Sequence, residues 1–260
     1  MTKSSNDKME QILPLYDRYV DTYRDENGQL PKMMRLKRTH TAFVVDNARK
    51  IAEGEGFGDE LKEAALIAAL LHDTGRYEQL KVYNTFRDSD SVDHAVFSHD
   101  IVREKGWISD KGILDAILFH NRRDLPEGLD ERTFLLSHTV RDADKLDIFR
   151  ILETEIASTD WKKDSRAFWN LPAMKQPNPD VIAAIVERRS VDYQNIKSLA
   201  DFVLIQVGWI ASGLHFATSR RLCDERHHLE FRRKFLLEVS PAESHGTIER
   251  LCDEIARAQG

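Results

Sequence analysis

The 260-residue chain has little cysteine, no excess of basic residues and no long uncharged apolar segment. Its two cysteines, Cys223 and Cys252, have no CxxC spacing, so we expect reduced thiols in a cytoplasmic protein. The net charge of −6 argues against a general electrostatic attraction to nucleic acid. No apolar run approaches the roughly 20 residues of a membrane span. We therefore expect neither a membrane nor nucleic acid as a partner, and the oligomeric state stays open.

The period-two alternation that is typical of strands is also absent. Apolar residues recur instead at helical spacing, and the hydrophobic content of 41% is enough for a substantial core. We predict an all-α fold that forms one domain over residues 1–260. Segment 77–90 has no clear period and is interpreted as a loop near a site. Segment 158–178, rich in Trp, Asn and Pro, is the only candidate linker.

One predicted helix organises the rest of the chain. It is rich in Ala and Leu and leads directly into His72 and Asp73. His72 continues the apolar stripe of this helix, and a buried histidine beside a buried aspartate is costly unless both are compensated. A bound metal ion compensates both, because imidazole and carboxylate are common metal ligands. The alternative is a helix that ends in a polar pair facing solvent.

Further candidate ligands occur on other predicted helices, 21 to 32 residues apart along the chain. His40 and His94 lie near helix starts, whereas His72 and His120 lie at helix ends. In an up-down bundle of antiparallel helices, starts and ends alternate at the same pole. We therefore expect the four histidines to converge. Each of them taken alone also fits a packed or capping residue, so the site prediction depends on their joint alignment.

Two aspartates complete the predicted set. Asp144 belongs to the buried stripe of a helix predicted over 130–152, and Asp73 follows His72 directly. Four imidazoles and two carboxylates exceed the needs of one ion, and with Asp73 bridging they suit two divalent ions roughly 3.5–4 Å apart. Nitrogen and oxygen ligands allow Mn, Fe, Co, Ni, Zn or Mg. Two such ions can clamp a phosphoryl group and acidify a bridging water.

The order of these residues, His40, then His72-Asp73, then Asp144, resembles the HD-domain superfamily of metal-dependent phosphohydrolases. His94 and His120 resemble the extra ligands of the branch that binds two metals. The chain lacks the Gly-Tyr-Pro motif found in cyclic-dinucleotide phosphodiesterases of that branch. The resemblance covers about 35–150. It implies a helical bundle with an HD core at about 35–155 and additional C-terminal helices at about 156–260.

The resemblance implies an enzyme that cleaves a phosphate ester of a small phosphorylated substrate, such as a nucleotide, with metal-activated hydroxide. Asp73 would be catalytic, bridging the ions and orienting water. Arg76 and Lys145 are adjacent to ligands and are predicted to bind the substrate phosphate, with a plain salt bridge as their alternative role. Two other functions fit the same residues. One is a mixed-valence di-iron oxygenase with the same ligand cage, and the other is a non-catalytic, metal-stabilised module that senses a ligand.

Overall fold

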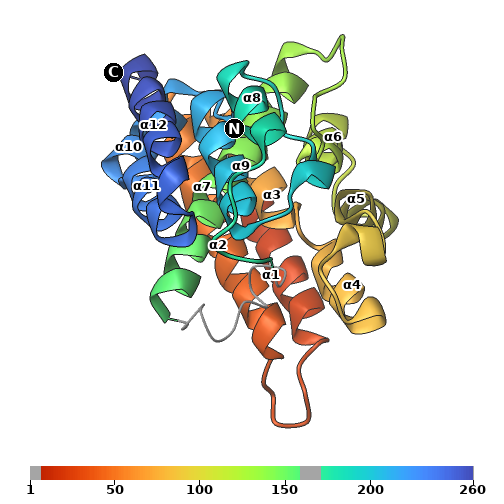
Figure 1. Ribbon diagram of the computed structural model, residues 1–260. Helices are drawn as coiled ribbons and strands as arrows, with labels where there is room; N and C mark the ends of the chain where they lie inside the picture. Colours follow the sequence, from red (N-terminus) through yellow and green to blue (C-terminus); the bar gives the residue numbers. More distant parts are fainter. Residues whose placement is uncertain (1–6, 159–170, 260) are drawn as a thin grey trace. The chain divides into compact units, whose positions relative to one another are not determined.

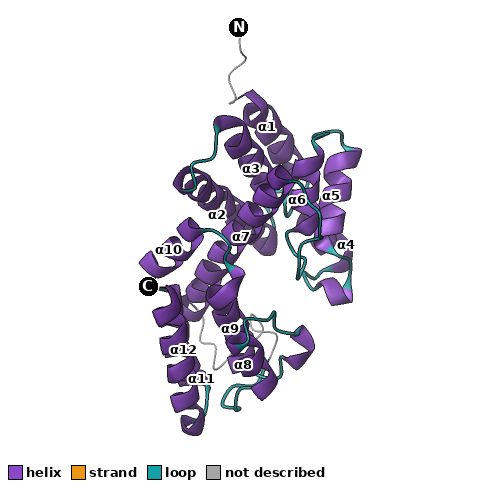
Figure 2. Cartoon of the chain, turned by 90° about the horizontal axis from the view of Figure 1, so that it is seen from above, coloured by secondary structure: helices purple, strands orange, loops and turns teal. Residues whose placement is uncertain are grey.

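The computed structural model describes residues 7–158 and 171–259. Figure 2 shows helices joined by loops, and this part of the chain contains no β-strand, which confirms the predicted all-α fold. The chain divides into two compact units, Met1–Asp147 and Ile148–Gly260, which are described separately. One domain over the whole chain stays a prediction, and most of the candidate linker lies outside the described residues. Across both described stretches, no helix has the length and apolar character needed to cross a bilayer.

The helices of the first unit follow one another along the chain (Figure 1). They are α1 (Asp7–Asp21), α2 (Lys32–Gly54), α3 (Asp59–Leu71), α4 (Gly75–Tyr83), α5 (His94–Glu104), α6 (Lys111–Phe119) and the first part of α7 (Glu131–Ser158). Asp93 and Asp110 cap α5 and α6, because their carboxylates accept hydrogen bonds from backbone N–H groups of the first turn. The Asp93 cap makes His94 the first residue of α5.

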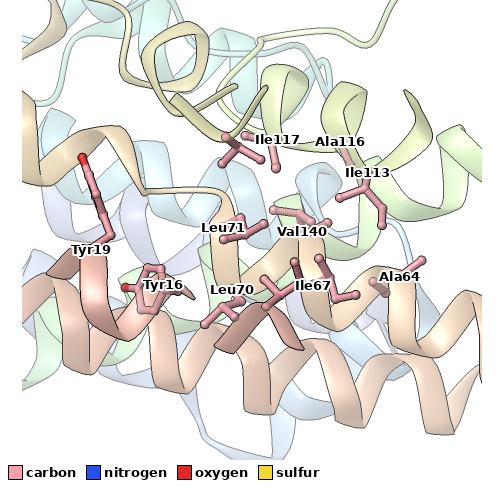
Figure 3. Packing of buried hydrophobic residues seen from close by; sticks show 14 of the residues in the cluster. Tyr16, Tyr19, Ala64, Ile67, Leu70, Leu71, Ile113, Ala116, Ile117 and Val140 are labelled. Carbon is pink, nitrogen blue, oxygen red and sulfur yellow. The ribbon is translucent and has the colours of Figure 1, made fainter. Parts of the chain in front are cut away.

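Helix α3 lies at the centre of the first unit's core. Every residue from 64 to 71 is buried, as expected for a helix that is apolar on all sides. Helices α1, α2 and α6 all contact it. In Figure 3, Leu70 and Leu71 of α3 belong to the same apolar cluster as Tyr16 of α1 and Ile117 of α6. Because α3 ends at Leu71, the next two residues emerge at the edge of this core.

Helix α4 is the main departure from the sequence prediction. Residues 77–83, interpreted above as part of a loop, are helical from Gly75 onward, and the helix ends at Asn84 in the left-handed region (φ 52°). Gly75 begins this helix close to α5. A Cβ added there would lie 2.7 Å from the backbone nitrogen of Ser98, so only glycine fits. The close contact holds the residues after Asp73 against α5.

The second unit contains the rest of α7 followed by further helices. They are α8 (Pro179–Val186), α9 (Leu199–Gly208), α10 (Ala217–Glu225), α11 (His228–Val239) and α12 (His245–Gln259). Helix α9 is continued by a π-helical turn, Trp209–Gly213. His227, whose φ is 55°, separates α10 from α11. Both cysteines are buried free thiols, as the prediction of reduced cysteines requires.

Candidate metal centre

Four buried histidines converge next to the C-terminal end of α3. His40 lies in the third turn of α2, His72 follows α3, His94 is the first residue of α5 and His120 follows α6. The ring centroid of His72 lies 5.4 Å from that of His40 and 5.0 Å from that of His120. The centroids of His94 and His120 are 4.9 Å apart. The structure therefore brings together the histidines that the sequence analysis singled out.

Asp73 lies between two pairs of these histidines, and each of its oxygens faces one pair. Oδ2 is 3.5 Å from Nε2 of His40 and 3.5 Å from Nε2 of His72. Oδ1 is 3.7 Å from Nε2 of His94 and 3.8 Å from Nε2 of His120. The carboxylate is 3% exposed, so its charge is shielded from water. Each oxygen of Asp73 therefore lies close to the Nε2 atoms of one histidine pair.

Asp144 lies close to the first histidine pair, His40 and His72. Its Oδ1 lies 3.1 Å from Nε2 of His40 and 3.9 Å from Nε2 of His72. Asp144 lies mid-helix on α7, as the sequence predicted. Ligand atoms of His40, His72 and Asp144 fall within 4.8 Å of one another, and so do those of His72, Asp73 and His120. Each group has the atoms and the spacing to surround a metal ion.

The other ring nitrogen of each histidine is held by a hydrogen-bond acceptor. His72 Nδ1 donates to the carbonyl of Ala69 and His120 Nδ1 to that of Ile117, both at 2.7 Å. The remaining two donate to carboxylates, His40 Nδ1 to Asp147 Oδ2 at 2.6 Å and His94 Nδ1 to Asp88 Oδ2 at 2.5 Å. Because Nδ1 carries the proton, each Nε2 presents a lone pair to the centre.

Those lone pairs have no donor to compensate them. Nε2 of His40 and Nε2 of His72 are buried, and no described residue forms a hydrogen bond with either. Nε2 of His94 and Nε2 of His120 face each other at 3.0 Å, where two lone pairs repel. Buried polar atoms without partners are costly. Divalent cations would satisfy all four nitrogens, so the residues present fit a metal centre.

The surroundings also favour the protonation states that metal binding requires. Burial, together with the neighbouring His94 and His72, lowers the pKa of His120 to about 3. Burial raises the pKa of Asp73, but Lys37, His72 and Arg76 overcome this and hold it well below its ordinary value. Burial and Lys37 lower the pKa of His40, whereas the neighbouring carboxylates of Asp144 and Asp147 raise it above its ordinary value. A proton can therefore compete with a metal at His40.

The two cations predicted to bind phosphate occupy different surroundings. Arg76 Nε lies 3.5 Å from Asp73 Oδ1 and is thus at the centre. Its Nη1 donates to Asp88 Oδ1, the carbonyl of Phe86 and Gln79 Oε1. Lys145 is half-buried directly after Asp144, and burial lowers its pKa to about 8. The geometry therefore favours Arg76 over Lys145 as a phosphate-binding side chain.

Three residues at the centre were not identified from the sequence. Asp147 supports His40, because its Oδ2 accepts the hydrogen bond from His40 Nδ1. Lys37 lies one turn before His40 on the same helix face, a spacing that could have revealed it, and its Nζ is 2.6 Å from Asp73 Oδ2. Asp88, which supports His94, lies in segment 77–90, which the sequence placed near a site without singling out this residue.

An all-α unit with four buried histidines and two carboxylates at one end of its core is a candidate metal-binding domain. The family model described as "HD domain" matches residues 38–148. The match confirms the family resemblance and contains all six predicted ligands. HD domains are typically metal-dependent hydrolases. Among curated proteins and among solved structures, nothing matches the chain.

Proposed function

We propose that this protein is a metal-dependent phosphohydrolase that uses two divalent ions to cleave a phosphate ester. The observation that carries the proposal is Asp73, whose two oxygens each face a separate histidine pair. One ion would be held by His40, His72, Asp144 and Asp73 Oδ2. The other would be held by His94, His120 and Asp73 Oδ1. When bound, such ions supply Lewis acidity and lower the pKa of a shared water.

The residues of the chain supply orientation, charge and exclusion of water. The Nδ1 hydrogen bonds hold each imidazole with its lone pair toward the centre. Asp73 and Asp144 are the carboxylates that balance cation charge, and Asp73 also accepts a proton or orients water next to the reacting phosphorus. Arg76 and Lys145 are the proposed partners of the substrate phosphate. The proposed substrate is a small phosphorylated molecule, such as a nucleotide.

The test combines elemental analysis with a panel of phosphate esters. We expect purified protein to contain up to two divalent ions per chain and to release phosphate or nucleotide from at least one ester. Asp73→Asn should abolish metal-dependent release. The control is Asp59→Asn, which removes a carboxylate that is 80% exposed on α3 and should change nothing. Full activity in the Asp73 variant would reject the mechanism.

The donor set also suits two irons, so a second outcome distinguishes the other enzyme class. If no ester turns over while iron fills both positions and a substrate drives oxygen uptake, the protein is an oxygenase with the same ligands. If metal removal melts the fold and neither chemistry occurs, the ions have a structural or sensing role.

A further inference from the structure

Asp73 is contacted by two cations as well as by four histidines. Lys37, on α2, has its Nζ 2.6 Å from Asp73 Oδ2, and Arg76, on α4, has its Nε 3.5 Å from Asp73 Oδ1. Each cation therefore lies on the oxygen that faces one of the two candidate ion positions. The side chains are 18% and 12% exposed, so both are shielded but still reach water. The two positive charges thus lie next to different oxygens of the same carboxylate.

One aromatic ring links these two cations. Lys37 Nζ lies 5.6 Å and Arg76 Cζ 5.7 Å from the ring centroid of Phe86, within the range of cation–π attraction. Arg76 Nη1 also donates to the Phe86 carbonyl at 2.7 Å and to Asp88 Oδ1 at 2.9 Å. The segment that carries Phe86 is thereby fixed next to Asp73. Contacts within the fold therefore hold both cations next to Asp73.

Both cations have N–H donors that make no hydrogen bond with a described residue at the centre. Arg76 Nε is buried, and no described atom forms a hydrogen bond with it. Lys37 Nζ has three protons, and it donates one of them to Asp73 Oδ2. A divalent ion on Asp73 Oδ2 would compete with the ammonium for that oxygen and repel it. Two donors near the ions would then be available to a second anion.

We infer that Lys37 and Arg76, spaced by Phe86, form the binding site for a dianionic terminal phosphate, which makes the preferred substrate a phosphomonoester. This inference rests on the proposed function. A monoester carries about −1.5 to −2 charge at pH 7, whereas a diester carries about −1. Two fixed cations beside two divalent ions favour the more highly charged group. Lys37 thus joins Arg76 as a residue that contacts the substrate and selects it by charge.

The experiment compares Lys37→Met with Lys37→Arg in the full-length, Mn²⁺-loaded protein. Calorimetry measures the binding of Mn²⁺ and then of inorganic phosphate, neither of which needs turnover. We expect Lys37→Met to bind Mn²⁺ at least as tightly as the wild type but phosphate roughly 10- to 100-fold more weakly, as for loss of a charge-assisted hydrogen bond. Lys37→Arg should restore most of the phosphate affinity. Lys50→Met, which removes an exposed lysine of the same helix, is the matched control.

Kinetics provide the second readout. With p-nitrophenyl phosphate, kcat/KM should fall in Lys37→Met by about the same factor as phosphate affinity, whereas with bis(p-nitrophenyl) phosphate it should fall only a few-fold. Unchanged phosphate affinity in Lys37→Met, or a loss of Mn²⁺ binding equal to the loss of phosphate binding, would show that Lys37 only supports Asp73 and would overturn the inference. If the wild type cleaves no ester of the panel, the proposed function fails, while the phosphate titration still decides the role of Lys37.

Discussion

The carboxylates behind two of the histidines allow the two ion positions to be weakened separately. His40 donates to Asp147 at 2.6 Å, and His94 donates to Asp88 at 2.5 Å. Asp147 is 1% exposed, so its charge acts on His40 with little screening. Asparagine keeps the shape and still accepts a hydrogen bond, but it removes the charge that makes the imidazole a stronger ligand. Asp147→Asn should therefore affect the ion that His40 binds, and Asp88→Asn the ion that His94 binds.

The expected magnitude follows from the role of such supporting carboxylates. Losing one typically lowers metal affinity about 10- to 100-fold, which is about 1.4–2.8 kcal/mol of binding free energy. Because the remaining ligands of each position are untouched, the other ion should keep its affinity within about threefold, the usual context dependence of such effects. Asp88 also accepts from Arg76 and Gln79, so its variant should additionally loosen the segment before α5.

Competition with a chromophoric chelator, followed by elemental analysis at each chelator concentration, measures both affinities. The wild type should lose its ions in two steps, and each variant should shift a different step. Asp100→Asn is the control. Asp100 accepts a hydrogen bond from His99 Nδ1 at 3.0 Å, so this substitution changes a histidine–aspartate pair outside the centre. If both variants shift the same step, or if only one ion binds to the wild type, the assignment of two positions that share Asp73 is wrong.

Three further predictions concern stability. Chelation should lower the melting temperature measured by calorimetry, because ions at 100 times their Kd contribute about 2.7 kcal/mol. Burial raises the pKa of Glu153, but His228 and Arg232 lower it below its ordinary value. The ionised carboxylate therefore stabilises the second unit above about pH 4.5, and this stability is lost as the pH falls through the lowered pKa. Glu153→Gln should flatten that acid dependence in urea titrations, and an unchanged slope would contradict the assignment. Gly75→Ala should cost about 1–3 kcal/mol of unfolding free energy in denaturant titrations, because the new Cβ meets the backbone of Ser98.

The histidine cluster was predictable because burial forces each ligand onto an apolar stripe. His72 follows a helix whose residues 64 to 71 are all buried, and this apolar run is visible in the sequence itself. The alternation of helix starts and ends then implied a common pole, and the ring distances of about 5 Å agree with it. A long periodic helix reports its buried face reliably, since many residues contribute to the pattern.

Helix α4 was missed for the opposite reason. It is nine residues long, and its buried positions include Tyr77 and Gln79, so the apolar period is lost. Gln79 is fully buried although it is polar, because its amide donates to Asp88, Ser91 and the Val92 carbonyl. A polar residue whose hydrogen bonds are made to a neighbouring segment can be buried, although the sequence pattern predicts that it is exposed. Short helices built around such hydrogen bonds need coordinates to be recognised.

The residues that support the centre mark the limit of sequence reasoning more sharply. Asp147 could be seen as an acid on a buried stripe, but its role depends on His40, 107 residues away, lying opposite it. The contact between Lys37 and Asp73 likewise joins residues 36 apart. Periodicity shows which side of a helix is buried, not which partner it meets there. Ligands can be predicted because the metal requires their chemistry, whereas supporting residues of many types can hold a ligand in place, so only the three-dimensional structure identifies them.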